Sequence, residues 1–109
     1  MSETEKNIMN EIMLALSEAG CMIFRNNIGC YKTDEGRFIR YGVGGNGSSD
    51  IVGMDQNGKF LAVEVKTKKG KARKNQINFI NQIRAHGGRA GIARSAEEAL
   101  SIIFEGANL

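Results

Sequence analysis

One stretch, residues 47–66, constrains the fold more than any other part of the chain. Two short runs of apolar and polar residues, Ile51 to Met54 and Lys59 to Thr67, flank a turn that contains Asn57-Gly58, a pair that tolerates positive φ. This pattern predicts a β-hairpin. Because successive side chains of a strand point to opposite faces, the second strand has one wholly apolar face and one mixed face. The apolar face carries Leu61, Val63 and Val65, and the mixed face carries Phe60, Ala62, Glu64 and Lys66.

Two acids and a lysine meet at the open end of this hairpin. Asp50 directly precedes the first strand, and the turn folds it back towards Glu64, which shares a face with Lys66. Adjacent carboxylates repel each other unless a cation lies between them. Mg²⁺ accepts one or two carboxylates and completes its shell with water and phosphate oxygens, an arrangement that hydrolyses phosphodiesters. In the alternative interpretation Asp50 only begins a strand, and Glu64 with Lys66 forms a solvated ion pair.

Charge is unevenly distributed along the 109 residues, whose formal net charge is +3. Residues 1–64 carry six basic and nine acidic side chains, whereas residues 65–109 carry nine basic and three acidic ones. A basic cluster begins where the acidic hairpin ends, and it suits a polyanion such as nucleic acid. A solvated loop and helix start is the alternative. The candidate DNA-binding residues in this cluster are Lys68, Lys69, Lys71, Arg73 and Lys74.

The N-terminal segment predicts an amphipathic helix. Ser2 and Glu5 form a capping box, apolar residues then recur at helical spacing, and Gly20 ends the run. Glu11 lies at the border of the apolar stripe, from which its carboxylate could reach a site under the helix. A glutamate that extends from the stripe edge into solvent is the alternative.

Three strands and a glycine-rich loop are predicted between this helix and the hairpin. Residues 21–25 indicate one strand, and residues 29–32 and 37–41 indicate a pair joined by a turn. Residues 42–49 form a flexible or tightly turning loop that leads to Asp50. This loop is not a phosphate-binding P-loop, because no Gly-Lys-Ser/Thr ends it and no helix follows.

The C-terminal third predicts helix, strand and helix, over residues 72–86, 89–94 and 96–104, with Gly106 ending the last helix. Gln76 falls within the apolar face of the first of these helices, so some polar group must lie beneath it. The acidic site and a strand carbonyl are the two candidates. A helix between two strands implies parallel pairing through a right-handed crossover. The expected fold is therefore α/β, a mixed central sheet with helices on both faces.

These residues, in this order, resemble the PD-(D/E)XK nuclease superfamily and, more narrowly, a VRR-Nuc domain. The resemblance covers nearly the whole chain: an acid on the first helix, Gly-Ser-Ser-Asp entering a strand, Glu-Val-Lys on the next strand, and a helix with glutamine. Each motif alone is weakly specific, and their order and setting are far stronger. Ser49 stands where the superfamily name has proline, which the VRR-Nuc pattern tolerates.

The resemblance implies a restriction-endonuclease-like core and a set of roles. Asp50, Glu64 and the Val65 carbonyl would bind Mg²⁺ or Mn²⁺, with Glu11 as a direct or water-mediated contributor. Lys66 would orient or activate water, and Gln76 would support the site or touch the scissile phosphate. Similar small nucleases, the Holliday-junction resolvases, work as homodimers, so the resemblance also implies a homodimer acting on branched DNA.

Length and composition are consistent with one domain, residues 1–109, without a membrane span or signal peptide, and we expect an intracellular, cytoplasmic protein. Cys21 and Cys30 lack metal-binding or redox spacing, and we expect reduced, partly buried thiols. The function predicted is a metal-dependent, structure-selective DNA endonuclease for four-way junctions or flaps. A non-catalytic nucleic-acid-binding protein and a sequence-specific nuclease of restriction type are the alternatives.

Overall fold

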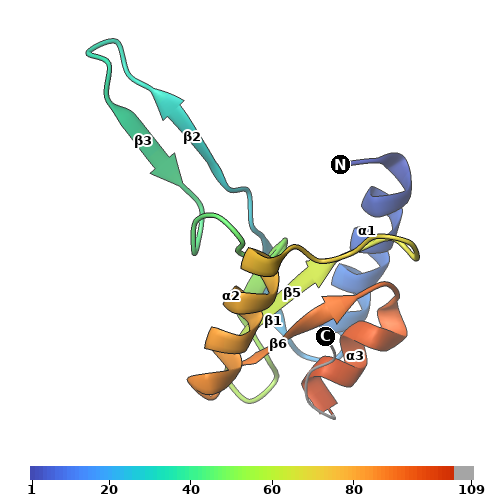
Figure 1. Cartoon of the computed structure of the whole chain (residues 1–109). Helices are drawn as coiled ribbons and strands as arrows, with labels where there is room; N and C mark the ends of the chain where they lie inside the picture. The colour runs from blue at the N-terminus through green and yellow to red at the C-terminus, as the bar shows by residue number, and fades with distance from the viewer. Residues whose placement is uncertain (105–109) are drawn as a thin grey trace.

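The computed structural model describes residues 1–104, and its helices and strands are shown in Figure 1. Gly106, predicted to end the last helix, lies outside the described residues. The elements follow in the order α1 (Glu3–Glu18), β1 (Met22–Arg25), β2 (Gly29–Lys32), β3 (Phe38–Tyr41), β4 (Ile51–Met54), β5 (Phe60–Val65), α2 (Lys74–Ala85), β6 (Arg89–Ala93) and α3 (Ala96–Phe104).

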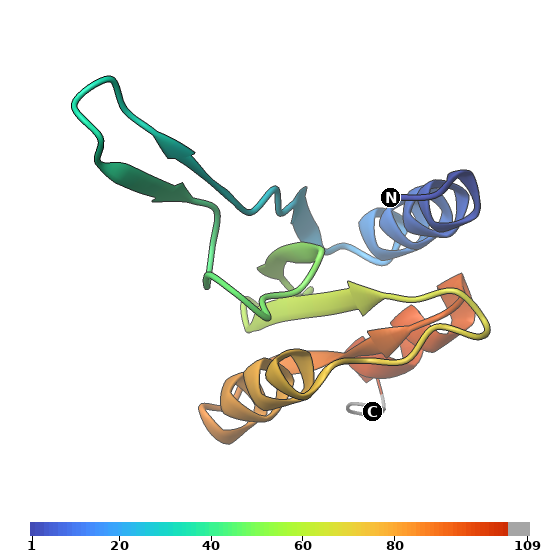
Figure 2. The ribbon, with the colours of Figure 1, turned by 45° about the horizontal axis from the view of Figure 1, so that its top comes forward.

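Four strands form one mixed sheet in the order β1-β4-β5-β6. The pairs β1–β4 and β4–β5 are antiparallel, and β5–β6 is parallel, with α2 as the connection that parallel neighbours require. Helix α2 packs against β5 and β6 on one face, and α1 and α3 pack together on the other (Figure 2). The predicted mixed sheet with helices on both faces is confirmed.

The side chains of β5 point alternately to the two faces of the sheet, so they belong to two separate core clusters. Leu61, Val63 and Val65 are at most 1% exposed and pack with residues of α1 and α3, among them Ile12 and Ile102. On the other face Ala62 belongs to a smaller cluster under α2 with Val52, Ile80, Ala90 and Ile92. Glu64 therefore lies on the α2 face, at the end of the smaller cluster.

Strands β2 and β3 form a separate two-stranded sheet that extends away from the core as an arm (Figure 1). The pairing predicted for these strands is confirmed, with Cys30 opposite Arg40 and Lys32 opposite Phe38. Nearly every residue of the arm is exposed, including Cys30, so the expectation of a partly buried thiol fails there, whereas Cys21 is buried in the core.

Element boundaries differ by one or two residues from those predicted. The predicted strand from Lys59 to Thr67 extends only over Phe60–Val65, so Lys66 follows the strand, although its N–H still donates to the Ala93 carbonyl at 3.1 Å. Helix α2 begins at Lys74 instead of Ala72. Within residues 1–104, no helix is long and apolar enough to cross a membrane.

Candidate active site

The pairing of β4 with β5 brings Asp50 beside Glu64. Ile51 pairs with Val63, so Asp50, one residue earlier, stands next to Glu64 in the register. The Val65 N–H donates to Asp50 Oδ2 at 2.9 Å, which fixes the aspartate against the end of β5. The expected convergence of the two acids at the open end of the hairpin is therefore present in the structure.

The two carboxylate oxygens of Glu64 have different surroundings. Glu64 is 3% exposed; its Oε2 accepts a hydrogen bond from Gln76 Nε2 at 2.5 Å and lies 3.3 Å from Lys66 Nζ. Within the part of the chain that the structure describes, Glu64 Oε1 is buried and has no hydrogen-bond partner. Oε2 therefore contacts an amide and an ammonium, whereas Oε1 has no hydrogen-bond partner among the described residues.

Burial and the neighbouring Asp50 carboxylate raise the pKa of Glu64 to about 7, and Lys66 opposes this rise only in part. The carboxylates of Glu64 and Asp50 are therefore not both ionised at low cost near neutral pH. A cation placed between them would remove that cost. The burial and charges of the site are therefore those of a cation-binding site. They differ from those of an ion pair between Glu64 and Lys66 alone.

The side chain of Gln76 makes two hydrogen bonds. It is 5% exposed, and its Oε1 accepts the N–H of Arg73 at the start of α2 while its amide nitrogen donates to Glu64. The polar group expected beneath the apolar face of α2 is thus the Glu64 carboxylate and not a strand carbonyl. This hydrogen bond restrains the orientation of Glu64, because the donor sits on the first turn of a packed helix.

The backbone of Val65 also faces this side. In a strand the N–H and C=O of one residue point to the same neighbour, so the Val65 carbonyl lies on the side where its N–H meets Asp50. Strand β4 begins only at Ile51, which pairs with Val63, so Val65 lies beyond the last paired residue of β5 on this side. Coordination by the Val65 carbonyl stays a prediction.

The donor set fits a hard divalent cation. It would consist of the two carboxylates with the Val65 carbonyl as the predicted third oxygen, and it includes Glu64 Oε1, which has no hydrogen-bond partner among residues 1–104. Among residues 1–104, no three His, Cys, Asp or Glu side chains are grouped as metal ligands. Two carboxylates suit Mg²⁺ or Mn²⁺ better than Zn²⁺ or Ca²⁺, because Mg²⁺ keeps several waters and binds few protein groups.

Glu11 is placed away from this cluster. It is exposed on α1 and is not among the residues that line the hollow around Asp50 and Glu64. Half-buried Glu5 lines that hollow instead, so the structure does not bring Glu11 to the two acids, and its role in the site stays a prediction. The reason is that α1 packs on the opposite face of the sheet and only its first turn reaches the site. Glu5 is four residues before the buried Met9, a spacing that places it on the apolar stripe.

The hollow is open, with a volume of about 520 Å³. Of the predicted DNA-binding residues, Lys71 and Arg73 line it, as does half-buried Lys66. Lys68, Lys69 and Lys74 are exposed and lie outside its lining. The basic cluster thus begins at the site and continues onto the surface.

Asn26, which has no assigned role in the sequence pattern, holds the glycine-rich loop and Asp50 together. Its Nδ2 donates to Val43 O at 2.9 Å and to Ser48 Oγ and Ser49 O at 3.0 Å, and its Oδ1 accepts the Val43 N–H at 2.9 Å. Its backbone N–H donates to the Asp50 carbonyl at 2.7 Å. The only sequence signal is a polar residue directly after a strand.

The glycine-rich loop packs closely against α2. At Gly44, φ is +89° and a Cβ would come within 2.6 Å of the Phe79 ring; at Gly47, φ is +87° and a Cβ would come within 2.6 Å of the Asn75 carbonyl oxygen. Only glycine permits both this conformation and this approach. The loop therefore positions Asp50 by tight packing.

This chain is similar to known proteins both in sequence and in structure. The family model described as the VRR-NUC domain matches residues 3–97. A solved structure of a VRR_NUC domain is similar with a TM-score of 0.63 at 17% identity, covering 94% of this chain and 96% of that one. No curated protein matches this chain. The family match extends over most of the sequence, and the solved structure has the same fold, so this chain belongs to the VRR-NUC domain family and has a nuclease-like fold.

Proposed function

We propose that this chain is a metal-dependent DNA endonuclease that hydrolyses phosphodiester bonds in branched DNA. The observation that carries the proposal is the buried Glu64 carboxylate, with Oε2 held by Gln76 and Lys66, Oε1 unpartnered within residues 1–104, and Asp50 beside it. Family membership supports a nuclease that acts on nucleic acid. Residues 1–109 are proposed to form one nuclease domain of an intracellular, cytoplasmic protein.

The residues of the site have distinct proposed roles. Asp50, Glu64 and the Val65 carbonyl would hold Mg²⁺ or Mn²⁺. When bound, the metal supplies a more acidic water and neutralises charge on the phosphoryl oxygens. Glu5, which lines the same hollow, is proposed to take the direct or water-mediated role expected of Glu11.

Lys66 is the residue proposed to act on the attacking water. Its ammonium lies 3.3 Å from Glu64 Oε2 and its side chain is 17% exposed, so the lysine is held at the edge of the site and remains accessible to substrate. A lysine ammonium is a compact charge that steadies a hydroxide and the developing charge of the phosphoryl group. Gln76 keeps Glu64 in place through its hydrogen bond.

A homodimer is proposed because a branched substrate offers two strands to two sites related by two-fold symmetry. The sheet face beside α2 offers an apolar surface for it. The register aligns Met22 with Met54 and Met54 with Phe60, and Phe24 lies on the same face; all four are more than a third exposed. Light scattering is expected to give a dimer for the wild type and a monomer for Phe24→Lys, and an unchanged dimer would place the interface elsewhere.

The test is cleavage of labelled four-way junction, flap, splayed-arm and linear duplex DNA with Mg²⁺, Mn²⁺ or EDTA, using the wild type and Asp50→Asn. We expect metal-dependent cutting of a branched substrate that is lost in the variant. If DNA is bound and never cut with either metal, the chain is a non-catalytic nucleic-acid-binding protein. A fixed cut sequence on linear duplex would assign a restriction-type nuclease.

A further inference from the structure

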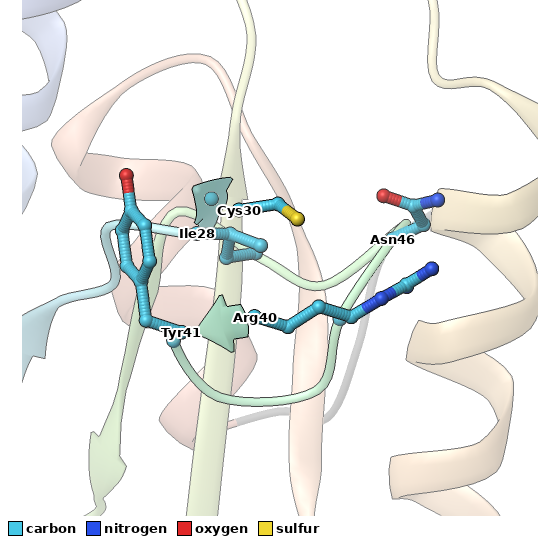
Figure 3. A pocket seen from close by; sticks show the side chains of 8 residues that line it. Ile28, Cys30, Arg40, Tyr41 and Asn46 are labelled. Carbon is cyan, nitrogen blue, oxygen red and sulfur yellow. The ribbon is translucent and has the colours of Figure 1, made fainter. Parts of the chain in front are cut away.

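A second hollow of about 450 Å³ lies at the base of the β2–β3 arm. Its lining includes Cys30, Arg40 and Asn46, together with glycines of the loop that leads to Asp50. Figure 3 shows the Arg40 side chain extending towards Asn46, with the Cys30 sulfur on the same side and the Tyr41 ring standing apart. The lining of the hollow therefore includes the Arg40 guanidinium, the Asn46 amide and the backbone of the glycines.

The register of the arm explains this arrangement. Cys30 pairs with Arg40 and Lys32 with Phe38, so these four side chains share one face. The other face carries Tyr31, Ile39 and Tyr41. Within residues 1–104, no carboxylate lies within ion-pair distance of Arg40. The arm thus turns a guanidinium without an ion-pair partner among the described residues towards the hollow, whose lining also includes Tyr41.

This hollow is linked to the candidate active site through shared lining residues. It shares Ile28, Gly45 and Asn46 with a neighbouring hollow of about 300 Å³, whose lining also includes Asp50, Glu64 and Arg73. Asp50, Glu64 and Arg73 in turn line the hollow that contains Lys66 and Lys71. The three adjoining hollows, called the trough below, have the two acids near the middle of the row and basic side chains at both ends.

A trough of this kind has the charge pattern that a nucleic acid strand requires on either side of a cleavage centre. Phosphates flanking the scissile one need cations, and guanidinium binds a phosphate through two parallel N–H bonds. Lys71 and Arg73 lie near the acids on one side. Arg40 is the corresponding cation on the other side, at the base of the arm.

Resting on the function proposed above, we propose that Arg40 and Asn46 form a remote subsite for the sugar–phosphate backbone of the strand being cut, with the β2–β3 arm clamping that strand. Arg40 donates to a phosphate, and Asn46 donates to or accepts from the backbone. Such contacts fix register and orientation and carry no sequence information. The subsite selects a nucleic acid strand that continues beyond the cleavage centre.

The first experiment compares Arg40→Ala with Arg37→Ala in binding of labelled duplex and single-stranded DNA in EDTA, over a range of salt. Arg37 is an exposed arginine of the same arm that lies outside the lining of the hollow, so it is the matched control. We expect Arg40→Ala to weaken binding about tenfold and to reduce the salt slope by about 1, with little change for Arg37→Ala. Equal salt slopes for the two variants would overturn the subsite.

The second experiment uses Cys30 as a probe. Cys30 is exposed in the hollow and Cys21 is buried, so alkylation of the folded chain with iodoacetamide reports Cys30, as peptide mass spectrometry can verify. We expect DNA in EDTA to slow alkylation of Cys30 at least severalfold. Protection with no cleavage in any metal would leave the subsite standing and overturn the nuclease. Cleavage by the wild type with Cys30 unprotected would overturn the subsite alone.

Discussion

The two ends of the β4–β5 hairpin each hold a buried carboxylate, but with opposite surroundings. At the turn end Asp55 is 4% exposed, and its Oδ1 accepts the N–H groups of Asn57 and Lys59 at 2.8 and 2.9 Å. Its Oδ2 lies 3.5 Å from Arg89 Nε in an ion pair. At the open end Glu64 is 3% exposed and is held by two side chains on a single oxygen, with Asp50 alongside.

These surroundings move the two pKa values in opposite directions. Burial would raise the pKa of Asp55, but the Lys59 and Asn57 N–H groups and Arg89 outweigh it, so the value lies below the ordinary one. At Glu64 the charge of Asp50 adds to burial, and the pKa rises to about 7. Asp55 is thus ionised to stabilise a turn, whereas the fold leaves ionised Glu64 at a disadvantage that a metal would remove.

The largest expected difference between the two ends is in catalysis. Glu64→Gln is expected to lower the cleavage rate by on the order of 10³-fold, because it removes a proposed metal ligand, whereas Asp55→Asn is expected to leave the rate within about threefold. Single-turnover cleavage at a temperature where both variants are folded measures this. A comparable loss in both variants would mean that the hairpin as a whole, and not its open end, limits activity.

Lys66→Ala is expected to reduce cleavage by about 10²-fold or more, because the charge beside the attacking water is lost. DNA binding should stay nearly unchanged, since one phosphate contact among several carries little affinity. Rates and dissociation constants measured in parallel check this. Lys59→Ala is the matched control, as Lys59 is exposed at the turn end and lies outside the hollow. Full activity of Lys66→Ala would remove the lysine from the mechanism.

For stability we expect the opposite order, because a substitution at the turn end should cost more than one at the open end. Asp55→Ala is expected to lower the free energy of unfolding by about 2 kcal/mol, because two backbone N–H groups and Arg89 lose their acceptor. Glu64→Gln is expected to be at least as stable as the wild type without metal, since its uncharged amide removes the repulsion with Asp50. Urea unfolding in EDTA distinguishes them. A Glu64→Gln variant that is clearly less stable would show that the ionised carboxylate supports the fold.

The basic segment that follows the open end has no counterpart at the turn. Neutralising Lys68, Lys69 and Lys71 together is expected to weaken DNA binding about tenfold and to flatten its salt dependence, because fewer phosphates are neutralised. Anisotropy titrations at several salt concentrations measure both. Lys59→Ala, next to the turn, serves as the control. An unchanged salt slope in the triple variant would mean that DNA runs elsewhere.

The raised pKa of Glu64 is also expected to appear in the pH dependence of stability. The pKa of Glu64 is raised in the folded chain, so its contribution is fully present below the ordinary value of 4.5 and is lost as pH rises towards about 7. In EDTA, the unfolding temperature of the wild type should therefore fall relative to Glu64→Gln across this window and run parallel above it. A constant difference from pH 4 to 8 would contradict the raised pKa.

Local pattern was sufficient to predict the hairpin, the approach of Asp50 to Glu64 and a polar group beneath Gln76. The Asn57-Gly58 turn fixes which residues pair, so Asp50 and Glu64 could be placed together without any long-range information. An amide on an apolar helix face required a polar group beneath it, and Glu64 is that group. These inferences rest on strand alternation and helix periodicity, which act over a few residues.

The missed residues depend on contacts between distant segments. Asn26 bonds to residues 17 to 23 positions away, and nothing in the neighbouring sequence signals that. Glu11 and Glu5 were both near the apolar stripe, and only the packing of α1 on the far face of the sheet decides that Glu5 reaches the site. The strand pair of the arm was predicted, but its exposure was not, because that depends on the arm extending away from the helices of the core (Figure 1).

The most direct test of the difference between the two ends is Mn²⁺ binding by isothermal titration calorimetry at pH 6.5, in buffers of different ionisation enthalpy. We expect binding with proton release for the wild type and for Asp55→Asn, because metal displaces the proton of Glu64, and binding at least about tenfold weaker for Glu64→Gln. Equal affinity in all three proteins would place the metal elsewhere and contradict the assignment of the open end as the catalytic site.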